Sequence, residues 1–453
     1  MTCGESAPVG GASRPGHPRV ARVLPAVGEP LEPRGFGLRS AAPLLAGLTC
    51  ALSFAACWLA QLALDLPLGD LDVYRAEGWA VRTGGDLYGL TVTAHELPAT
   101  YPPFAALLFV PLTLLSVDAI RGLVCVLNFA LVVALAHLSL RLVGGRLAPW
   151  HTGVSLTVAS LAVWSEPVWA TIRYGQINLL LVVLVLWDLT RRADHRWAGV
   201  ATGVAAGIKL TPALFAVLLT AAGTVLAVAR LRRGEPPGNP HLRWATRSWL
   251  AFAGTVGVGV LLLPRESWRF WTDVVLAGDR VGAAEAAANQ SLRGVLARVL
   301  HTGDLSPWWL SAAAAVCCAG VAVSVAALLA ADRLPLATAW AATSCAVTAL
   351  LVSPVSWSHH WVWAVPVSVL LFAEARRRRD RVWRIAAWTA TLLAFSYASW
   401  LLPHDESRPE LHLSAAQQLV AAAYPLAGTC LLIAAGTLAV RAGRARHRAV
   451  PAR

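Results

Sequence analysis

Charged residues are scarce in this chain, where Asp, Glu, Lys and Arg together make up 14% of 453 residues. Hydrophobic residues make up 57%. Apolar stretches of about 18 or more residues recur along the sequence, which is the signature of membrane-spanning helices. A soluble chain of this length divides into domains with charged surfaces, and the composition excludes that class. The sequence therefore predicts an all-α, polytopic membrane protein.

The chain also lacks the patterns of metal-binding and nucleic-acid-binding proteins. Its cysteines form no CxxC, so neither a zinc site nor a disulfide framework is indicated, and we expect no metal and no cofactor. Despite a net charge of +13, no basic segment is interleaved with aromatic residues in a soluble module, so a nucleic-acid partner is not expected. Arginines cluster instead before the first apolar run, at 376–379 and at 441–448. Under the positive-inside rule these clusters predict two cytoplasmic termini in a multi-pass protein of the cell membrane.

The sequence divides into three parts. Residues 1–40, rich in Gly, Pro and Arg, are predicted to be a disordered cytoplasmic N-terminus, and 441–453 a basic cytoplasmic tail. Between them, 41–440 forms one membrane domain with large extracytoplasmic loops at 65–102 and 264–305. The expected apolar segments lie near 41–64, 103–117, 120–140, 151–164, 176–190, 197–209, 211–229, 247–263, 306–330, 334–353, 358–373, 382–402 and 414–440.

The number of these segments conflicts with two cytoplasmic termini, which require an even number of crossings. The short run 151–164, or one of its two predecessors, is the candidate that fails to cross, so we expect about twelve spans. With the basic loops on the cytoplasmic side, the connections that carry unusual polar residues share the far side. They are 65–102, 165–175, 209–212, 264–305, 353–360 and 403–413.

Two carboxylates, Asp70 and Asp72, follow the first predicted span and precede the aromatic Tyr74. One interpretation is a solvated helix cap, because Asp at a helix start satisfies free backbone N–H groups. The aromatic residue and the long polar loop favour chemistry instead. A carboxylate at a membrane interface is suited to act as general base on a hydroxyl acceptor.

Two further polar stretches combine a rigid backbone with hydrogen-bonding side chains. In Tyr101-Pro102-Pro103 the prolines remove two backbone donors and fix two φ angles, which predicts either a plain helix start or a rigid border of a cleft. The stretch 173–178 opens a span with Arg173, Gln176 and Asn178. Amides there either hydrogen-bond between helices or bind sugar hydroxyls, since an amide both donates and accepts.

Lys209 is the single lysine of the chain and stands between two apolar runs. An ionisable residue in such a place is a candidate functional group by default, and a phosphate is its natural partner. The alternative is an ammonium that snorkels to the membrane interface.

The connection 353–361 carries His359, His360 and Trp357. Adjacent histidines on a helix point about 100° apart, so they seldom share a metal ion. We expect one of them to bind a phosphate or a sugar hydroxyl, with tryptophan as a stacking surface; the alternative is an interfacial aromatic belt. Asn289, in a triplet with Gln290 and Ser291, is a weaker candidate that also fits a helix cap.

Taken in order, these motifs resemble glycosyltransferase family 87. The motifs are Asp70-x-x-Val73-Tyr74, Tyr101-Pro102-Pro103, Gly175-Gln176-x-Asn178, Lys209-x-x-Pro212, Asn289-Gln290-Ser291 and Ser353-Pro354-x-Ser356-Trp357-x-His359-His360. The resemblance covers about residues 41–440. It implies a GT-C fold with an extracytoplasmic active site under the first large loop, and transfer of a sugar from polyprenyl phosphate with inversion and without a required metal.

The resemblance also implies roles for the candidate residues. Asp70 matches the catalytic carboxylate better than Asp72, and one histidine of the His359/His360 pair matches the second essential polar residue. Lys209 and Arg173 are then expected to bind the donor phosphate. The expected substrate-binding residues are Asp72, Tyr74, Tyr101, Gln176, Asn178, Asn289 and Trp357.

Two alternative functions remain at this point. Within the same class, the donor is polyprenyl-phosphate arabinofuranose instead of polyprenyl-phosphate mannose. In a different class, the protein is a transporter or lipid flippase, but we find no repeat at a fixed spacing, and the polar groups gather at one face rather than at the bilayer midplane. The acceptor, a glycolipid or a glycan, has no readable signature in the sequence, and neither has the oligomeric state.

Overall fold

The computed structural model describes residues 38–64, 68–93, 96–144, 150–192, 195–278, 280, 282–305, 307–405 and 407–449. Most of the N-terminus that we expect to be disordered, and the last residues of the tail, therefore lie outside the described residues. Among those described, nearly all regular structure is helical. The exception is a small antiparallel hairpin of β1 (Thr91–Val92) and β2 (Leu97–Pro98).

Six helices of the described chain are long and apolar enough to cross a membrane. About 20 residues of helix cross the hydrocarbon core of a bilayer, so their lengths suit that task. Their outer faces expose leucines that a soluble protein would bury; in the first helix Leu44 is 76% exposed. A multi-pass, all-α membrane protein is therefore confirmed. The six are α1 (Leu38–Ala63), α4 (Val117–Leu142), α9 (Ala213–Leu231), α10 (Pro240–Leu262), α13 (Trp308–Leu329) and α18 (Ala423–Ala449).

Shorter helices pack between and beside the long ones. One of them, α5, falls on the predicted run 151–164, and its 13 residues span about 20 Å, against about 30 Å for the hydrocarbon core. However, α7 and α8, which fall on segments expected to cross, are shorter still, so length does not single out α5, and the count of twelve spans stays a prediction. The shorter helices are α3 (Pro103–Phe109), α5 (Trp150–Ala162), α7 (Asn178–Leu189), α8 (Val200–Ile208), α14 (Ala337–Val352), α15 (Ala364–Arg378) and α16 (Arg381–Ala394).

The remaining helices lie in connections. Ser414 caps α17 with a capping box completed by Gln417, and Ser291 caps α12, as expected for hydroxyl side chains at helix starts. The helices are α2 (Gly69–Thr83), α6 (Glu166–Tyr174), α11 (Pro264–Thr272), α12 (Leu292–Val299) and α17 (Ala415–Ala421). The 3-10 turns are η1 (Val110–Leu114), η2 (Val274–Leu276), η3 (Ser358–Trp363), η4 (Ala398–Leu401) and η5 (Pro409–His412).

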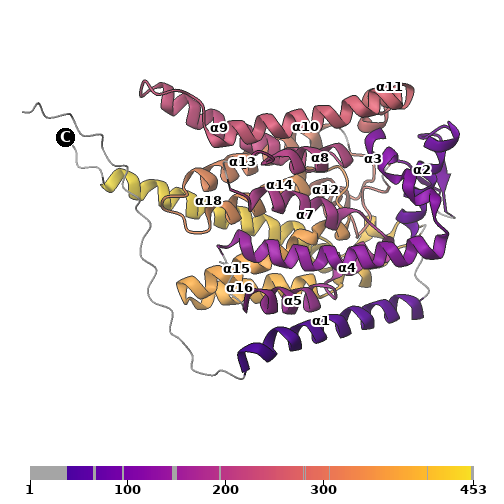
Figure 1. Ribbon diagram of the computed structural model, residues 1–453, viewed down its shortest axis with the longest axis horizontal. Coiled ribbons are helices and arrows are strands. Elements are labelled where there is room, and N and C mark those ends of the chain that lie inside the picture. The colour runs from indigo at the N-terminus through magenta and orange to yellow at the C-terminus, as the bar shows by residue number, and fades with distance from the viewer. Residues whose placement is uncertain are drawn as a thin grey trace, which may run out of the picture.

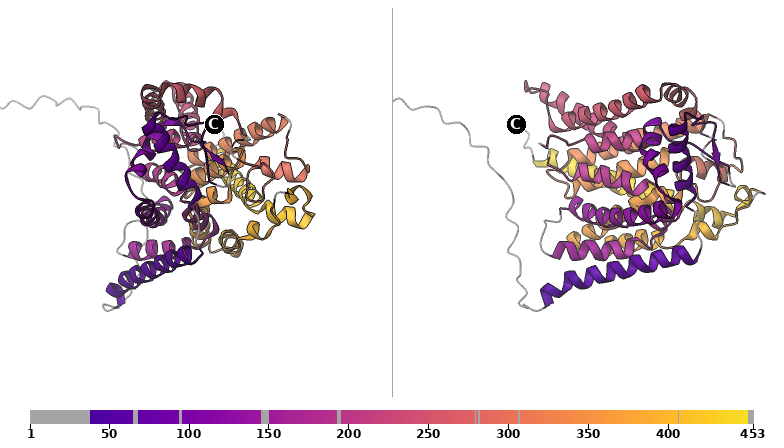
Figure 2. Two further views of the ribbon diagram at one scale, coloured as in Figure 1. Left: turned by 90° about the vertical axis from the view of Figure 1, so that its right-hand side faces the viewer. Right: turned by 45° about the vertical axis from the view of Figure 1, so that its right-hand side comes forward.

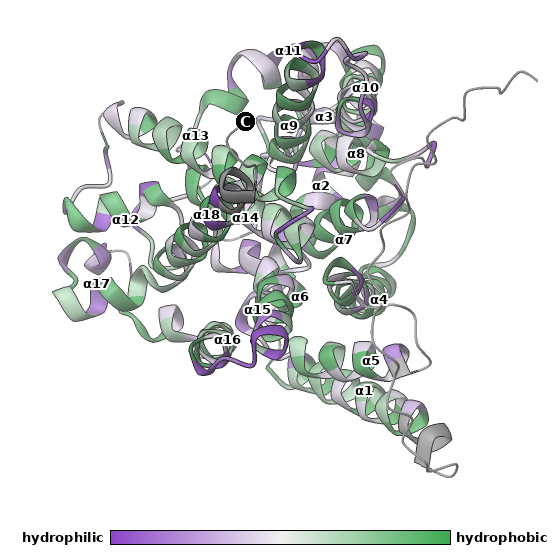
Figure 3. Ribbon diagram, turned by 90° about the vertical axis from the view of Figure 1, so that its left-hand side faces the viewer, coloured by the Kyte–Doolittle hydropathy of each residue, from purple (hydrophilic) through white to green (hydrophobic). Residues whose placement is uncertain are grey.

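The helices run side by side, and the bundle has two unlike ends. Figures 1 and 2 show α2, α3 and α11 together at one end. The connection between α9 and α10, the connection between α15 and α16, and the end of α18 lie at the opposite end (Figure 1). Figure 3 shows mainly hydrophobic helices, with hydrophilic colour at the connection between α15 and α16.

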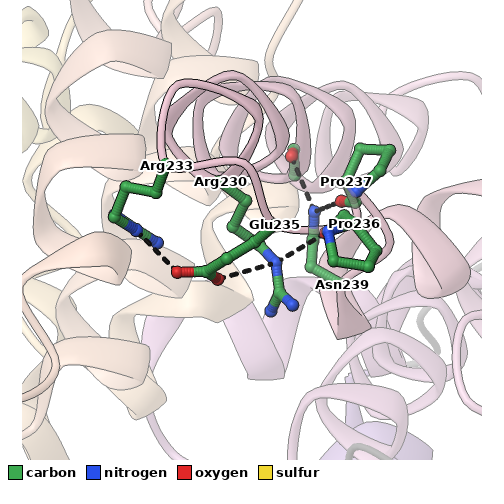
Figure 4. A network of polar contacts seen from close by, with 7 residues as sticks. Arg230, Arg233, Glu235, Pro236, Pro237 and Asn239 are labelled. Carbon is green, nitrogen blue, oxygen red and sulfur yellow. Dashed lines mark hydrogen bonds and ion pairs between the residues drawn. The ribbon is translucent and has the colours of Figure 1, made fainter.

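The connection between α9 and α10 is basic and internally bonded. Arg233 donates to Glu235 at 2.8 Å, and Arg230 approaches the same carboxylate at 3.5 Å (Figure 4). Asn239 caps α10 and donates to the Pro237 carbonyl at 3.2 Å. Arginines therefore mark this end of the bundle, as the sequence predicted for these connections.

The centre of the bundle is α14, which is buried along almost its whole length. A helix that is apolar on every side belongs in the interior of a bundle. The large side chain of Trp340 is fully buried in this helix, and its polar atom has a hydrogen-bond partner: the indole N–H donates to Glu374 at 2.9 Å. The C-terminal end of α14 leads into the connection that carries His359 and His360.

Candidate active site

The first helix after α1 positions Asp70. Residues Asp70, Tyr74 and Glu77 are spaced by four and then three positions in α2, so they lie on one face of that helix. The residue at the N-cap is Leu68, and its side chain makes no capping bond. Asp70 is half-buried in the first turn, where its side chain hydrogen-bonds Gln176, a partner that a solvated cap would not require.

Gly175 brings the end of α6 against α2. Its φ of +70° is left-handed, which glycine adopts without the steric cost that a Cβ adds. A Cβ placed there would lie 2.8 Å from the Cβ of Leu71 in α2. Glycine is therefore needed twice at this point, for the turn and for the close approach, and the chain emerges from the turn with Gln176 beside Asp70.

A buried network of hydroxyl groups orients Gln176. The phenol of Tyr74 donates to Gln176 Oε1 at 2.9 Å, and the phenol of Tyr101 donates to the same oxygen at 3.2 Å. The two phenols lie 2.9 Å apart. Because the amide oxygen accepts from the tyrosines, the amide nitrogen is left to donate to the Asp70 carboxylate.

Asp70 has an elevated pKa in this surrounding. Burial raises the pKa of its carboxyl above the ordinary value, because removal from water disfavours the charged form. The hydrogen bond from Gln176 and the positive charge of Lys209 act in the opposite direction. A carboxylate with a raised pKa is a stronger base than a solvated one, which suits proton abstraction.

Lys209 lies in the extended residues between α8 and α9 and points into the same site. Its ammonium donates to Asn178 Oδ1 at 3.3 Å and lies 3.1 Å from His360 Nε2. It also stands over the ring of Tyr101, 5.4 Å from the centroid. Burial lowers the pKa of Lys209 to about 8, while the charge of Asp70 raises it in part. Neutral groups thus hold the ammonium in place, and among the described residues no carboxylate forms an ion pair with it.

The histidine pair sits in η3, held by the ends of α6 and α7. Thr171 and Asn178 both donate to the carbonyl of His359, at 3.0 and 3.3 Å. Burial and then the charge of Lys209 lower the pKa of His359 to about 3, and the same causes lower the pKa of His360 well below its ordinary value. Both rings are therefore neutral near pH 7 and act as hydrogen-bonding groups, not as cations.

An apolar groove leads to Lys209. It runs along α7, α9 and α14 and contains about 500 Å³ of empty space, part of it open to the surroundings. Hydrophobic side chains line its length, whereas Asn178, Lys209 and His360 line its polar part. The apolar residues are Leu181, Val182, Val185, Phe215, Ala346, Ala349, Leu350 and Trp363.

Arg173 and Asp72 lie at the edge of this arrangement. The guanidinium of Arg173 packs over the rings of Tyr174 and Trp400, at 5.8 and 5.1 Å, instead of facing the groove. Asp72 is half-buried in α2, two positions from Asp70 and so on a different face of the helix. Neither residue contributes to the network around Gln176.

Asn289 and Trp357 form a separate scaffold. Asn289 is fully buried, its amide oxygen accepts from the Ser356 N–H at 3.0 Å, and its amide nitrogen donates to the Ala284 carbonyl at 2.8 Å. A backbone bridge also pairs Asn289 with Trp357. Asn289 thus ties the loop 264–305 to the residues before η3, and its expected contact with substrate stays a prediction.

Two buried carboxylates near the site, Glu77 and Glu166, are not among the residues predicted from the sequence. Glu77 lies behind Tyr74 on α2, and burial raises its pKa well above the ordinary range. Glu166 begins α6 and accepts from Trp400 Nε1 and from the Tyr424 hydroxyl, each at 2.9 Å. A signal for Glu166 existed in the sequence, since it is a lone acid among apolar residues just after the run 151–164.

Together these groups support one kind of chemistry. A single basic carboxylate, Asp70, faces a site that also contains one ammonium, Lys209, and neutral hydrogen-bonding side chains. An ammonium beside an apolar groove suits a phosphate that carries a long hydrocarbon tail. The base and the cation are close enough for their charges to affect each other's pKa.

Known proteins similar to this chain share one activity in their names. A polyprenol-phosphate-mannose-dependent alpha-(1-2)-phosphatidylinositol pentamannoside mannosyltransferase of Mycobacterium tuberculosis is 35% identical over 340 residues, covering 74% of this chain and 72% of the relative. A polyprenol-phosphate-mannose-dependent alpha-(1-2)-phosphatidylinositol mannoside mannosyltransferase of Mycolicibacterium smegmatis is 33% identical over 350 residues, covering 72% and 74%.

A solved structure and a family model complete the comparison. ArnT from Cupriavidus metallidurans, bound to undecaprenyl phosphate, is 14% identical and covers 86% of this chain and 77% of that one. With a TM-score of 0.38 this likeness is too distant to bear on fold or mechanism. The model of glycosyltransferase family 87 matches residues 99–354, which is more than half of the chain. The resemblance to the family is thereby confirmed, and the chain belongs to glycosyltransferase family 87.

Proposed function

We propose that this chain is an inverting hexosyltransferase that moves a mannosyl residue from polyprenyl phosphate to a hydroxyl group of a glycolipid or glycan. Asp70 is the general base, and the reaction takes place on the extracytoplasmic face. The single observation that carries the proposal is the convergence of four side chains from separate connections: Lys209 and His360 line the polar part of an apolar groove, and Asp70, held by Gln176, lies close enough to Lys209 for their charges to interact.

The reaction needs one base. Asp70 takes the proton of the acceptor hydroxyl while that oxygen attacks the anomeric carbon from the face opposite the phosphate. The bond between the anomeric carbon and the phosphate oxygen breaks, and its electron pair stays on the leaving phosphate. This single displacement inverts the anomeric centre. Gln176 supports the step by holding the carboxylate through a bond that the tyrosines orient.

The leaving phosphate needs positive charge and hydrogen-bond donors more than it needs an acid. Lys209 supplies the charge as negative charge develops on the departing oxygen. His360 accepts from Lys209 at Nε2, which leaves its Nδ1–H free to donate. The apolar groove along α7, α9 and α14 suits the polyprenyl chain, which can remain in the bilayer while its head reaches the site.

The names of the relatives favour mannose as the transferred sugar and a phosphatidylinositol mannoside as the acceptor. Relatives from two organisms, at 35% and 33% identity, carry the same donor in their names. An arabinofuranosyl donor is the less supported alternative, because none of these names contains it. A transporter or flippase is disfavoured, since the polar groups meet at one end of the bundle.

The proposed membrane orientation follows from charge. Arginine-rich connections lie at the end of the bundle opposite α2 (Figure 1). By the positive-inside rule that end faces the cytoplasm together with both termini, so the site opens on the other side. The same proposal places a basic N-terminus, residues 1–40, and a basic tail, residues 441–453, in the cytoplasm on either side of the membrane domain at 41–440.

The proposal is tested by transfer assays on membranes that contain the protein. The membranes receive radiolabelled polyprenyl-phosphate mannose and a phosphatidylinositol mannoside, and wild type is compared with Asp70→Asn. The matched control is Asp118→Asn, an exposed carboxylate at the start of α4. We expect a loss of about 100-fold or more in kcat for the first variant, as general-base removal gives, and wild-type transfer for the control.

Two results contradict parts of this proposal separately. Equal transfer by wild type and Asp70→Asn removes Asp70 from its role as base. Transfer from polyprenyl-phosphate arabinofuranose alone replaces mannose as the sugar and leaves the mechanism in place.

A further inference from the structure

Arg173 is a half-buried cation that no anion of the described residues neutralises. Within the described ranges it forms neither an ion pair nor a hydrogen bond, and its Nε is buried without a partner. A guanidinium carries five N–H donors in a planar fork, so leaving them unused in a half-buried place is costly. Such a group calls for a ligand that accepts hydrogen bonds and carries negative charge.

The position of Arg173 is fixed by its neighbours. Its guanidinium packs over Trp400, and the indole N–H of that residue donates to Glu166 Oε1 at 2.9 Å. The other oxygen of Glu166 accepts from the Tyr424 hydroxyl at 2.9 Å. Glu166 therefore holds the tryptophan that supports the cation, and its own oxygens are occupied. A cation held in this way loses little freedom when it binds an anion.

Arg173 and Lys209 face different parts of the protein. Starting from Lys209, the contacts run through His360, His359 and Tyr174 before they reach Arg173. The groove beside Lys209 belongs to α7, α9 and α14, whereas Trp400 comes from η4, which follows α16. Figure 3 shows α9 and α16 on opposite sides of α14.

The side of the bundle near Arg173 is open to lipid. Along α16, apolar residues at helical spacing are exposed, and Leu401 in η4 is 83% exposed. A lipid that lies against this face brings its headgroup to the level of η4, next to Trp400. The exposed residues of α16 are Val382, Ile385, Trp388 and Leu392.

We propose that Arg173 binds the phosphodiester of an anionic glycolipid acceptor, separately from the donor phosphate at Lys209. The inference rests on the proposed function and gives Arg173 an acceptor role in place of the donor role that its sequence suggested. The planar fork matches two oxygens of a phosphodiester, which a neutral glycan lacks. The acceptor enters beside α16 and the donor beside α9, so the sugar passes between them at Asp70.

The test compares two acceptors that carry the same mannosides, one on phosphatidylinositol and one on a neutral alkyl chain. The measured quantity is the ratio of kcat/KM for the anionic acceptor to kcat/KM for the neutral one. We expect Arg173→Gln to lower this ratio about tenfold or more, as loss of hydrogen bonds to a charged group does. The control is Arg293→Gln, another half-buried arginine, which packs over Trp309 but, unlike Arg173, donates to a protein acceptor, the Gly278 carbonyl.

Several outcomes overturn the inference. If Arg173→Gln lowers transfer to both acceptors equally, the residue is structural; if it raises the KM of the donor and leaves the ratio unchanged, it binds the donor phosphate. A ratio that falls equally in Arg293→Gln also removes the claim, because the effect is then not specific to Arg173. Absence of transfer by wild type with either acceptor contradicts the proposed function instead.

A direct binding measurement tests the inference even if a variant, or the wild type, transfers no sugar. Glycerophosphoinositol, the soluble headgroup, is titrated by calorimetry into the detergent-solubilised protein. We expect wild type and Arg293→Gln to bind it alike, and Arg173→Gln to bind it at least about tenfold more weakly. Equal affinity for wild type and Arg173→Gln overturns the inference without any turnover.

Discussion

At the scale of single residues, the proposed mechanism gives two ionisable groups that would limit the pH range of activity from opposite sides. Asp70 must be ionised to accept a proton, and its pKa is raised by burial. Lys209 must be protonated to bind a phosphate, and its pKa is lowered to about 8. His359 has a pKa near 3 and therefore contributes no titration near neutral pH.

The first prediction is a bell-shaped dependence of kcat/KM on pH. As the pH falls through the raised pKa of Asp70, the carboxylate takes up a proton and the rate decreases. As the pH rises through about 8, Lys209 loses its proton and kcat/KM falls about tenfold for each further unit. Initial rates at low donor concentration between pH 4 and pH 10 check both limbs.

The alkaline limb has its own control. Arginine stays protonated throughout that range, so Lys209→Arg is expected to remove the limb near pH 8 while it retains part of the activity. A limb that persists unchanged in this variant means that another group titrates there.

A second prediction concerns Gln176→Glu. This change keeps the shape of the side chain and its oxygen acceptors for Tyr74 and Tyr101, but it places a second negative charge beside Asp70. A like charge in contact raises a carboxyl pKa, so the acid limb of the profile should move upward by about one unit or more. An acid limb at its wild-type position shows that Asp70 is not the group that titrates.

The sequence identified the polar residues of this site better than the residues that hydrogen-bond to them. Lys209 was identifiable because it is the single lysine, and the amides were identifiable because they open an apolar run. Glu166 was missed because the donors that satisfy it, Trp400 and Tyr424, lie 234 and 258 residues away. The scaffold bonds of Asn289 depend on the fold in the same way, and its residue type gives no sign of them.

At the scale of elements, the junction between α6 and α2 decides whether Gln176 reaches Asp70. The left-handed glycine and its approach to Leu71 set this distance. Gly84 at the end of α2 has nearly the same φ, +68°, but a Cβ there meets nothing within 4 Å. Both glycines therefore have a left-handed backbone, but only Gly175 also lies too close to another helix for a Cβ.

The third prediction compares Gly175→Ala with Gly84→Ala. Backbone strain alone costs about 1 kcal/mol at each site, so Gly84→Ala should lower the Tm slightly and leave transfer intact. Gly175→Ala adds a clash that pushes α2 away and should lower kcat by a larger factor than the Tm explains. Thermal unfolding in detergent and transfer assays measure the two effects, and equal behaviour of the variants contradicts the argument.

The helices themselves followed closely from the sequence. Long apolar runs fix where a chain must be helical in a bilayer, because every backbone polar group there needs an internal partner. For example, the expected segment 120–140 is α4, and 334–353 is α14. The helix α2 in the polar loop 65–102 was not predicted. Its buried residues pack against α3 and η1 and not against lipid, so the sequence has no long apolar run there.

At the scale of the whole molecule, the unlike ends of the bundle define an orientation that can be measured. Gly84 lies at the end near the site, and Gly234 lies in the arginine-rich connection between α9 and α10. Both have a left-handed φ and open space around a Cβ, so cysteine should cost the same at each. The two positions form a matched pair for labelling.

The fourth prediction applies to a background in which the eight native cysteines are replaced by serine. A membrane-impermeant maleimide then labels Gly84→Cys in intact cells and leaves Gly234→Cys unlabelled until the cells are opened. The reason is the positive-inside rule, which keeps the arginine-rich end in the cytoplasm. The reverse pattern contradicts the proposed extracytoplasmic site, and labelling of both variants in intact cells contradicts a fixed orientation.

The solitary Lys209 has a consequence for chemical labelling. A side-chain amine with a pKa of about 8 is partly unprotonated at neutral pH and is therefore nucleophilic, unlike an ordinary lysine. Because Lys209 is the single lysine of this sequence, an amine-selective acylating reagent has no other lysine side chain to modify. A bound donor shields the amine, so the degree of protection from acylation measures donor occupancy of the groove without a turnover assay.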